Sequence, residues 1–187
     1  MLFYAELRVR ENPEISPQVI LNMLFEKLHL ILAEQGRSDV GISFPDVKNG
    51  QKNLGKIIRL HGEKNTLNDV LSHPLAERMG DYAEVGRTRK TPDNTDYCVV
   101  SRVQAKSSPE RLRRRSMKRH GISMEQAVEK IPDSAAEMLE LPFITLSSRS
   151  TGQKFRLYIR HKKADVESEN KVFSSYGLSP VSTVPWF

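Results

Sequence analysis

The succession of apolar patterns in the first 86 residues most constrains what this chain can fold into. An apolar stripe at helical spacing, from Ile20 to Leu32, predicts a helix over residues 17–35. Short runs of aliphatic and aromatic residues, bounded by turn-forming residues, predict strands around it. The expected elements are, in chain order, a strand (2–9), the helix (17–35), two strands (40–44 and 57–61), a second helix interrupted near Pro74 (66–79) and a strand (82–86).

This order of strand, helix, strand, strand, helix, strand is the ferredoxin-like pattern, which RNA-recognition modules share without its proving a function. A polar, turn-prone stretch at 88–96 indicates a domain boundary. We therefore expect an α+β protein with an N-terminal ferredoxin-like domain over 1–94 and a smaller C-terminal domain over 95–187. The second domain is expected to contain a strand (97–105), a basic helix (108–120), two short helical pieces (124–131 and 133–140) and a hairpin (143–148 with 153–160).

Composition and cysteine content exclude several classes of protein. Of the 187 residues, 38% are hydrophobic and 28% are charged, which indicates a folded core. The single cysteine, Cys98, excludes an intramolecular disulfide framework and a zinc cluster built on several thiolates. No apolar run is long enough to span a membrane, and the N-terminus has no signal-peptide pattern. We expect a cytoplasmic protein that does not enter a membrane.

The positive charge of the chain is concentrated in one window. Residues 101–120 hold eight of the 29 Lys and Arg residues but only one of the 23 acidic residues, Glu110, so their net charge is +7 and that of the remaining chain is −1. Such a concentration favours an acidic partner, with nucleic acid as the leading class. A solvated helix face or a disordered basic tail is the alternative interpretation.

Within this window, cationic side chains recur at helical spacing. Arg111, Arg115 and Arg119 are four residues apart, and Arg114 and Lys118 flank them, so a helix would present a cationic stripe about 12 Å long. The major groove of A-form RNA is normally closed to proteins, but a helix could enter it at the open end of a short stem. The pattern therefore favours an RNA hairpin over a long duplex.

Two residues before this helix have the chemistry of base readers. Arg102 and Gln104 are two apart on the predicted strand, so they would share one face. Arginine pairs with the N7 and O6 edge of guanine, and glutamine pairs with adenine. An ordinary half-exposed strand remains the alternative.

Histidine is the residue type best able to carry metal-free chemistry here. None of the five histidines has a metal-binding spacing, and no Walker-type glycine loop occurs, so no metal or other cofactor is expected. RNA can be cut without a metal when a base near neutral pKa activates its own 2′-hydroxyl. His29 is a candidate, although packing at the border of the apolar stripe is the simpler interpretation. The hydroxyl residues at 147–151 are likewise typical of a turn.

Several ordered strings of residues closely resemble one known family, the repeat-processing endoribonucleases of the type I-F CRISPR system. The similarity covers the whole chain. The strings are SRVQAK (101–106), SPERLRRR (108–115), IPD (131–133), LPFITL (141–146), STGQKFRLYIRH (150–161), YGLS (176–179) and the terminal VPWF.

The resemblance implies a ferredoxin-like domain plus a smaller domain that carries the arginine-rich helix. It implies that the substrate is the repeat stem-loop of precursor CRISPR RNA. The cut would fall at the 3′ base of the stem and leave a 2′,3′-cyclic phosphate and a 5′-hydroxyl, without a metal. A protein of this family is expected to be a monomer when free, to keep its RNA product and to join the other subunits of the type I-F surveillance complex.

The resemblance also implies roles for individual residues. His29 would be the general base, Tyr176 would orient it, and Ser148 would hold the nucleotide whose 2′-hydroxyl attacks. Ser150 would support the phosphate. The expected RNA-binding residues are Arg102, Gln104, Arg111, Arg114, Arg115, Lys118, Arg119, Ser150, Thr151 and Phe155. Among them, Arg102 and Gln104 would read bases, and Phe155 would stack under the last base pair.

This chain departs from the family pattern at two places. Lys118 stands where an arginine is expected, so a bidentate phosphate contact is replaced by a point charge. The glycine-rich C-terminal loop of the wider superfamily is reduced to Gly177. Two alternative functions remain at this stage: a repeat-binding subunit that has lost its activity, and a DNA-binding regulator with a recognition helix at 109–120.

Overall fold

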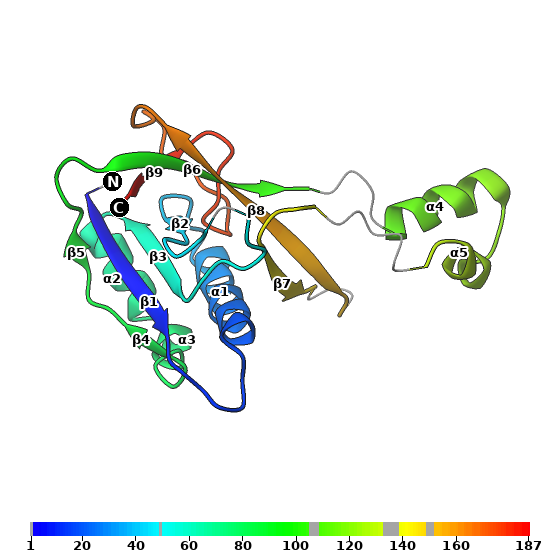
Figure 1. Cartoon of the computed structure of the whole chain (residues 1–187), viewed down its shortest axis with the longest axis horizontal. Helices are drawn as coiled ribbons and strands as arrows, with labels where there is room; N and C mark the ends of the chain where they lie inside the picture. The colour runs from blue at the N-terminus through cyan, green and yellow to red at the C-terminus, as the bar shows by residue number, and fades with distance from the viewer. Residues whose placement is uncertain (1, 49, 105–108, 133–138, 149–151) are drawn as a thin grey trace. The chain divides into compact units, whose positions relative to one another are not determined.

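The computed structural model describes residues 2–48, 50–104, 109–132, 139–148 and 152–187 (Figure 1). Helices and two antiparallel sheets make it an α+β protein, which confirms the predicted class. Within the described part of the chain, no helix has both the length and the apolar character that a membrane span requires.

The chain divides into two compact units. The larger unit contains residues 1–103 and 141–187, and the smaller contains residues 104–140. The domain boundary expected near residue 94 stays a prediction.

The first sheet of the larger unit has the strand order β2-β3-β1-β4, with every neighbouring pair antiparallel. A short strand inside the connection expected at 88–96 also pairs with β1. The sequence did not predict this strand, because two residues are too few to show a strand pattern. The strands are β1 (Phe3–Val9), β2 (Gly41–Ser43), β3 (Ile57–Gly62), β4 (Ala83–Val85) and β5 (Arg89–Lys90).

Helix α1 (Pro17–Glu34) supplies much of the core of the larger unit, as the apolar stripe predicts. Pro17 occupies its first position and Gly36, with a φ of +61°, follows its end. The predicted break near Pro74 is confirmed, since it separates α2 (Lys64–Leu71) from α3 (Pro74–Glu77). The buried α1 residues are Ile20, Leu21, Leu24, Phe25, Leu28, Ile31 and Leu32.

The second sheet has the strand order β7-β8-β6-β9. The predicted hairpin is confirmed, with Leu146 of β7 opposite Phe155 of β8. Strand β9 was not expected from the sequence; its Pro185 is tolerated because β9 is an edge strand. The strands are β6 (Asp96–Val103), β7 (Phe143–Ser147), β8 (Lys154–Ala164) and β9 (Thr183–Trp186).

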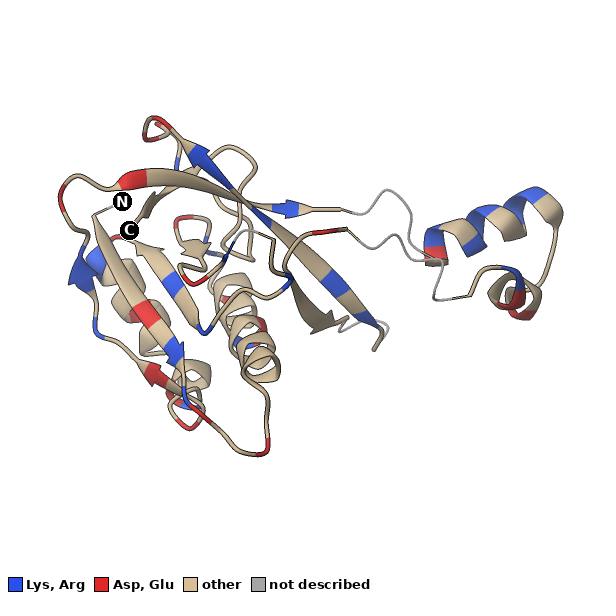
Figure 2. Ribbon diagram, viewed as in Figure 1, with Lys and Arg blue, Asp and Glu red and all other residues tan. Residues whose placement is uncertain are grey.

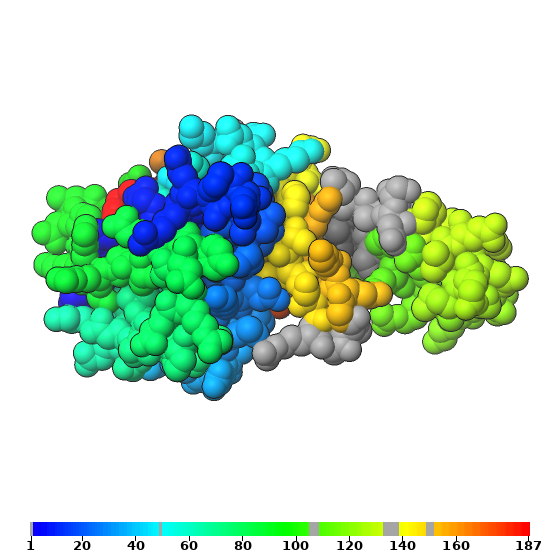
Figure 3. All heavy atoms as spheres, turned by 90° about the horizontal axis from the view of Figure 1, so that it is seen from below, coloured from blue at the N-terminus to red at the C-terminus, as the bar shows by residue number. Residues whose placement is uncertain are grey.

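Hydrogen bonds tie α1 to the edge strand β7. The Gln18 side-chain amide donates to the Phe143 carbonyl at 3.3 Å, and the Thr145 amide donates to the Asn22 side chain at 3.3 Å. Figure 3 shows the atoms of α1 (blue) directly against those of β7 (yellow). These hydrogen bonds fix the position of the β7–β8 hairpin relative to α1.

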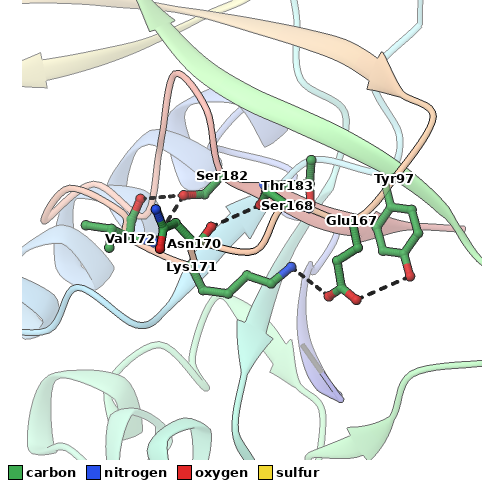
Figure 4. Close-up of polar contacts among 8 residues, drawn as sticks. All are labelled: Tyr97, Glu167, Ser168, Asn170, Lys171, Val172, Ser182 and Thr183. Carbon is green, nitrogen blue, oxygen red and sulfur yellow. Dashed lines mark hydrogen bonds and ion pairs between the residues drawn. The ribbon is translucent and has the colours of Figure 1, made fainter.

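The segment between β8 and β9 is held by side-chain contacts (Figure 4). Ser168 and Thr183 exchange two hydrogen bonds of 2.8 Å from backbone amide to hydroxyl. Glu167 accepts from Lys171 at 2.6 Å, and this contact lowers the pKa of the Glu167 carboxyl to about 2. These contacts hold residues 167–172, which lead directly into a turn at 174–178.

The smaller unit contains α4 (Pro109–His120) and α5 (Met124–Lys130). Ser123 and Gln126 form a capping box at the start of α5. The Arg113 side chain donates to the Ile131 carbonyl at 2.8 Å, which links the two helices. The helical piece expected at 133–140 falls largely on 133–138, outside the described residues.

Candidate active site

A cleft of about 300 Å³ lies in the larger unit, between α1, the β7–β8 hairpin and the turn at 174–178. It brings together His29, Ser148, Tyr176 and Phe155, which are far apart in the sequence. Their roles remain predictions, but all four contribute to one surface. The lining residues are Glu26, His29, Leu30, Leu146, Ser147, Ser148, Phe155 and Tyr176.

The ring of His29 is held in one tautomer by a backbone contact. Its Nδ1 lies 2.9 Å from the Ser175 carbonyl oxygen. A carbonyl can only accept a hydrogen bond, so Nδ1 carries the proton, and the neutral ring keeps its lone pair on Nε2. A half-buried histidine in this state can take a proton from a group in the cleft.

Tyr176 fixes the plane of the His29 ring. The two rings stack with centroids 3.9 Å apart and planes 9° apart, and the Phe25 ring is also parallel to Tyr176, with centroids 6.3 Å apart. Aromatic packing of this kind removes rotational freedom from the imidazole. The geometry makes Tyr176 a positioning residue for His29.

The turn at 174–178 places both Tyr176 and the Ser175 carbonyl. Gly177 donates to the Ser174 carbonyl at 2.8 Å, while its own carbonyl accepts from the Ile42 amide at 2.8 Å. Its φ is +67°, and a Cβ at this position would collide with the Ile42 side chain. Only glycine therefore lets the turn lie this close to β2.

Ser148 follows β7 at the loop end of the hairpin, where the chain turns toward β8. Its amide donates to the Gln153 carbonyl at 2.8 Å, and its carbonyl accepts from Gly152 at 2.7 Å. These bonds hold the backbone of Ser148 at the cleft wall. Ser150 and Thr151, also predicted to contact RNA, lie outside the described residues.

Of the five histidines, only His29 lines this cleft in the described part of the chain. His61 is buried against Ser43, with 2.8 Å between Nε2 and Oγ, and burial lowers its pKa well below the usual value. His161 lies between Phe44 and Trp186, and burial lowers its pKa to about 4. His61 is a core residue, and His161 is half-buried with both ring nitrogens buried, so both rings stay neutral at neutral pH. Within the described ranges, no three His, Cys, Asp or Glu side chains gather as a metal-binding group.

The predicted cations of α4 are all exposed. Figure 2 shows the Lys and Arg positions as blue bands along this helix. Leu112, Arg113, Ser116 and Met117 are half-buried, and they share one face of the helix at i, i+1, i+4 and i+5 spacing. The exposed cations are Arg111, Arg114, Arg115, Lys118 and Arg119.

The two candidate base readers are both exposed. Arg102 lies on β6 opposite Ile159. Strand β6 ends at Val103, so Arg102 lies on the strand and Gln104 lies just beyond it. The prediction that the two side chains share one face of a strand therefore stays untested.

Sequence reasoning missed two parts of the cleft. Glu26 lies one turn before His29 on α1, and the i, i+3 spacing could have indicated it. The Ser175 carbonyl could not have been found, because every residue carries the same backbone acceptor.

Comparison with known proteins identifies the family of the chain. Residues 4–187 match the family described as CRISPR-associated protein (Cas_Csy4). A Pseudomonas aeruginosa (strain UCBPP-PA14) protein named CRISPR-associated endonuclease Cas6/Csy4 is 46% identical over 184 residues, 98% of each chain. An Escherichia coli (strain UTI89 / UPEC) protein of the same name is 40% identical over the same share. The family predicted from the motifs is thus confirmed, and the chain belongs to the Csy4 family of type I-F CRISPR repeat-processing enzymes.

Proposed function

We propose that this protein is a metal-independent endoribonuclease that binds the repeat hairpin of precursor CRISPR RNA and cuts at the 3′ base of the stem. The observation that carries this proposal is the oriented His29, whose Nε2 lone pair is available in a cleft shared with Ser148 and Phe155. Membership of the family supports the repeat hairpin as the substrate. The position of His29 in the cleft supports cleavage through the RNA 2′-hydroxyl.

In the proposed reaction, His29 Nε2 accepts the proton of the 2′-hydroxyl upstream of the cut. The 2′-oxygen then bonds to the adjacent phosphorus, and the bond from phosphorus to the 5′-oxygen breaks. The leaving oxygen takes a proton, so the products are a 2′,3′-cyclic phosphate and a 5′-hydroxyl. Because the nucleophile belongs to the substrate, most of the rate gain is positioning and proton transfer.

The other cleft residues position the reacting groups. Tyr176 holds the imidazole by stacking, and Ser148 holds the ribose that carries the attacking hydroxyl. Phe155 stacks on the last base pair, which contributes roughly 1–3 kcal/mol to binding. Ser150 supports the phosphate, and Thr151 also contacts the RNA.

Affinity for the stem comes from α4 in this proposal. Its exposed cations neutralise phosphates, while Arg102 and Gln104 read guanine and adenine at the stem base. The free protein is a cytoplasmic monomer that retains the cut hairpin and joins the type I-F surveillance complex. The ferredoxin-like arrangement of the N-terminal part belongs to this proposal, and the strand order β2-β3-β1-β4 supports it.

Cleavage in EDTA tests the chemistry directly. Purified protein is mixed with labelled repeat hairpin and, separately, with a copy that has a single 2′-deoxy substitution at the stem base. We expect one cut in the normal RNA and none in the deoxy RNA. His29→Ala should abolish cutting and leave binding within about threefold, because the side chain acts on the proton rather than on the stem.

Other outcomes would favour the alternatives. Tight binding with no cut in either RNA would indicate a repeat-binding subunit without activity. Cutting that requires added Mg²⁺, or that persists on the deoxy RNA, would refute the 2′-hydroxyl route. A preference for duplex DNA would favour a DNA-binding regulator.

A further inference from the structure

Strand β8 presents a row of cations on the face that points away from the core, separate from α4. Lys154, Arg156, Arg160 and Lys162 are exposed, whereas Leu157 and Ile159 between them are fully buried. Figure 2 shows the blue bands that repeat along this strand. Alternation of this kind places the four cations, which we call the β8 stripe, on one face of the sheet, where the buried side chain of Tyr158 separates Arg156 from Arg160.

No carboxylate neutralises this face among its neighbours in the sheet. Thr145 lies opposite Arg156, Ser101 opposite Arg160 and Val99 opposite Lys162. In the described chain, Arg160 and Lys162 form no ion pair, whereas the next residue, Lys163, pairs with Asp96 at 3.7 Å. Arg160 and Lys162 therefore offer uncompensated charge to a polyanion.

The spacing of the stripe suits a nucleic acid strand. Alternate residues of a strand are about 6.8 Å apart, comparable to the separation of successive phosphates, and eight steps from Lys154 to Lys162 span about 27 Å. Aromatic surface accompanies the charge, because the Arg156 guanidinium lies 4.7 Å from the Phe143 ring centroid. Cations interleaved with aromatic side chains are typical of surfaces that bind single strands.

One end of the stripe adjoins the cleft. Ser147, which lines the cleft, is the register partner of Lys154, the first stripe residue. The RNA strand that is cut must leave this cleft on the 3′ side of the scissile phosphate, and there it is no longer paired in the stem. The other strand at the stem base does not pass through the cleft.

We propose that the β8 stripe binds the single-stranded RNA that follows the cut site, on the 3′ side. This inference rests on the proposed function and adds a second RNA contact to it. The stripe holds the precursor more tightly than the bare hairpin. After the cut, the downstream fragment is held by the stripe alone and dissociates, while the hairpin stays on the protein.

The test compares the double variant Arg160→Gln/Lys162→Gln with the control Lys163→Gln/Lys90→Gln. Both remove two exposed charges, but the control residues lie outside the stripe, Lys90 being paired with Asp93 at 3.8 Å. Affinity is measured for a non-cleavable 2′-deoxy hairpin alone, with a 3′ extension of about six nucleotides, which spans the stripe, and with an equal 5′ extension.

We expect the 3′ extension to tighten wild-type binding roughly tenfold at low salt and to steepen the salt slope by about 1.4, for two phosphates. The stripe variant should lose this gain, yet bind the bare hairpin and cut it in EDTA like wild type. The control should keep the gain. No gain from the 3′ extension, the same gain from the 5′ extension, or a gain that survives in the stripe variant would overturn the inference. Failure to bind or cut the bare hairpin would instead count against the proposed function.

Discussion

Three histidines of the larger unit show how surroundings decide the role of a single residue. His61 and His161 are enclosed by core atoms, and burial keeps both neutral. His29 is half-buried, and the Ser175 carbonyl selects its Nδ1–H tautomer. The same side chain is thus a packing element at two positions and a candidate base at the third.

Tyr176 is expected to act through its ring. Tyr176→Phe keeps the stack on His29 and should cleave at nearly the wild-type rate, while Tyr176→Leu should be roughly tenfold slower, because an aromatic pair contributes about 0.5–1.5 kcal/mol. Single-turnover cleavage and hairpin affinity are measured for both variants. If Tyr176→Phe were as slow as Tyr176→Leu with unchanged affinity, the hydroxyl rather than the stack would be the contributing group.

Buried His161 should make the fold sensitive to acid. The pKa of His161 is about 4 in the folded chain and about 6.5 in the unfolded chain. Between these two pH values the unfolded chain is protonated at this residue while the folded chain is not, and this difference favours unfolding. Stability is therefore complete at pH 7 and falls as the pH drops from 6.5 to 4, by about 2 kcal/mol at pH 5 for this group. His61 acts in the same direction.

Urea unfolding of wild type and His161→Phe at pH 7 and pH 5 checks this. The variant keeps an aromatic ring between Phe44 and Trp186 and should lose about 2 kcal/mol less than wild type between the two pH values. An equal loss in both proteins would contradict the assignment.

At the scale of elements, the turn at 174–178 joins β2 to the cleft. Gly177→Ala would place a Cβ against Ile42 and force a residue with φ of +67° out of its position. We expect a loss of about 1–3 kcal/mol in unfolding free energy and a clear loss of cleavage, because the Ser175 carbonyl and Tyr176 move with the turn. Urea unfolding and cleavage assays measure the two effects.

Gly36→Ala is the matched control for that change. Gly36 has a similar φ of +61°, but nothing lies within 4 Å of where its Cβ would stand. This variant should lose stability through backbone strain alone and cleave normally while folded. Equal loss of cleavage in both variants would mean that strain, not displacement of the turn, is responsible.

Two arginines of α4 are expected to have different roles, Arg113 in packing and Arg115 in RNA binding. Arg115 is exposed, so Arg115→Ala should weaken hairpin binding roughly tenfold and reduce the salt slope by about 1 without unfolding the helix. Arg113 bonds to the Ile131 carbonyl, so Arg113→Ala should instead raise hydrogen exchange across α4 and α5. Identical effects of the two substitutions on affinity would argue against this division.

At the scale of the whole molecule, the distribution of charge matters more than its sum. The net charge is +6, and α4 alone holds six Lys or Arg residues against one acid, Glu110. Such a distribution suits a polyanion that approaches α4, while the summed charge of the remaining residues stays close to zero.

Hairpin affinity should therefore depend steeply on salt. If the five exposed cations of α4 each neutralise one phosphate, the slope of log affinity against log salt is about −4. Raising the salt from 50 to 200 mM should weaken binding a few hundredfold. Titrations of the non-cleavable hairpin at several salt concentrations measure the slope, and an affinity that does not change with salt would exclude α4 as the main contact.

The sequence by itself determined the family and most of the elements, with β5 and β9 as exceptions. The apolar stripe of α1, the break at Pro74 and the β7–β8 hairpin follow from local periodicity and turn chemistry, which neighbouring residues impose on each other. The exposed cations of α4 follow from the same spacing. Long ordered motifs were enough to predict the family.

Only the tertiary structure decided how distant segments meet. From the residues alone, His29 was more easily explained as a packing residue, and Tyr176 carried no signal. Their stacking, the hydrogen bond to the Ser175 carbonyl and the pairing of β9 with β6 all depend on contacts across long stretches of chain. Backbone donors and acceptors are alike in every residue except proline, so no residue type records which carbonyl will orient an imidazole; the fold makes that choice.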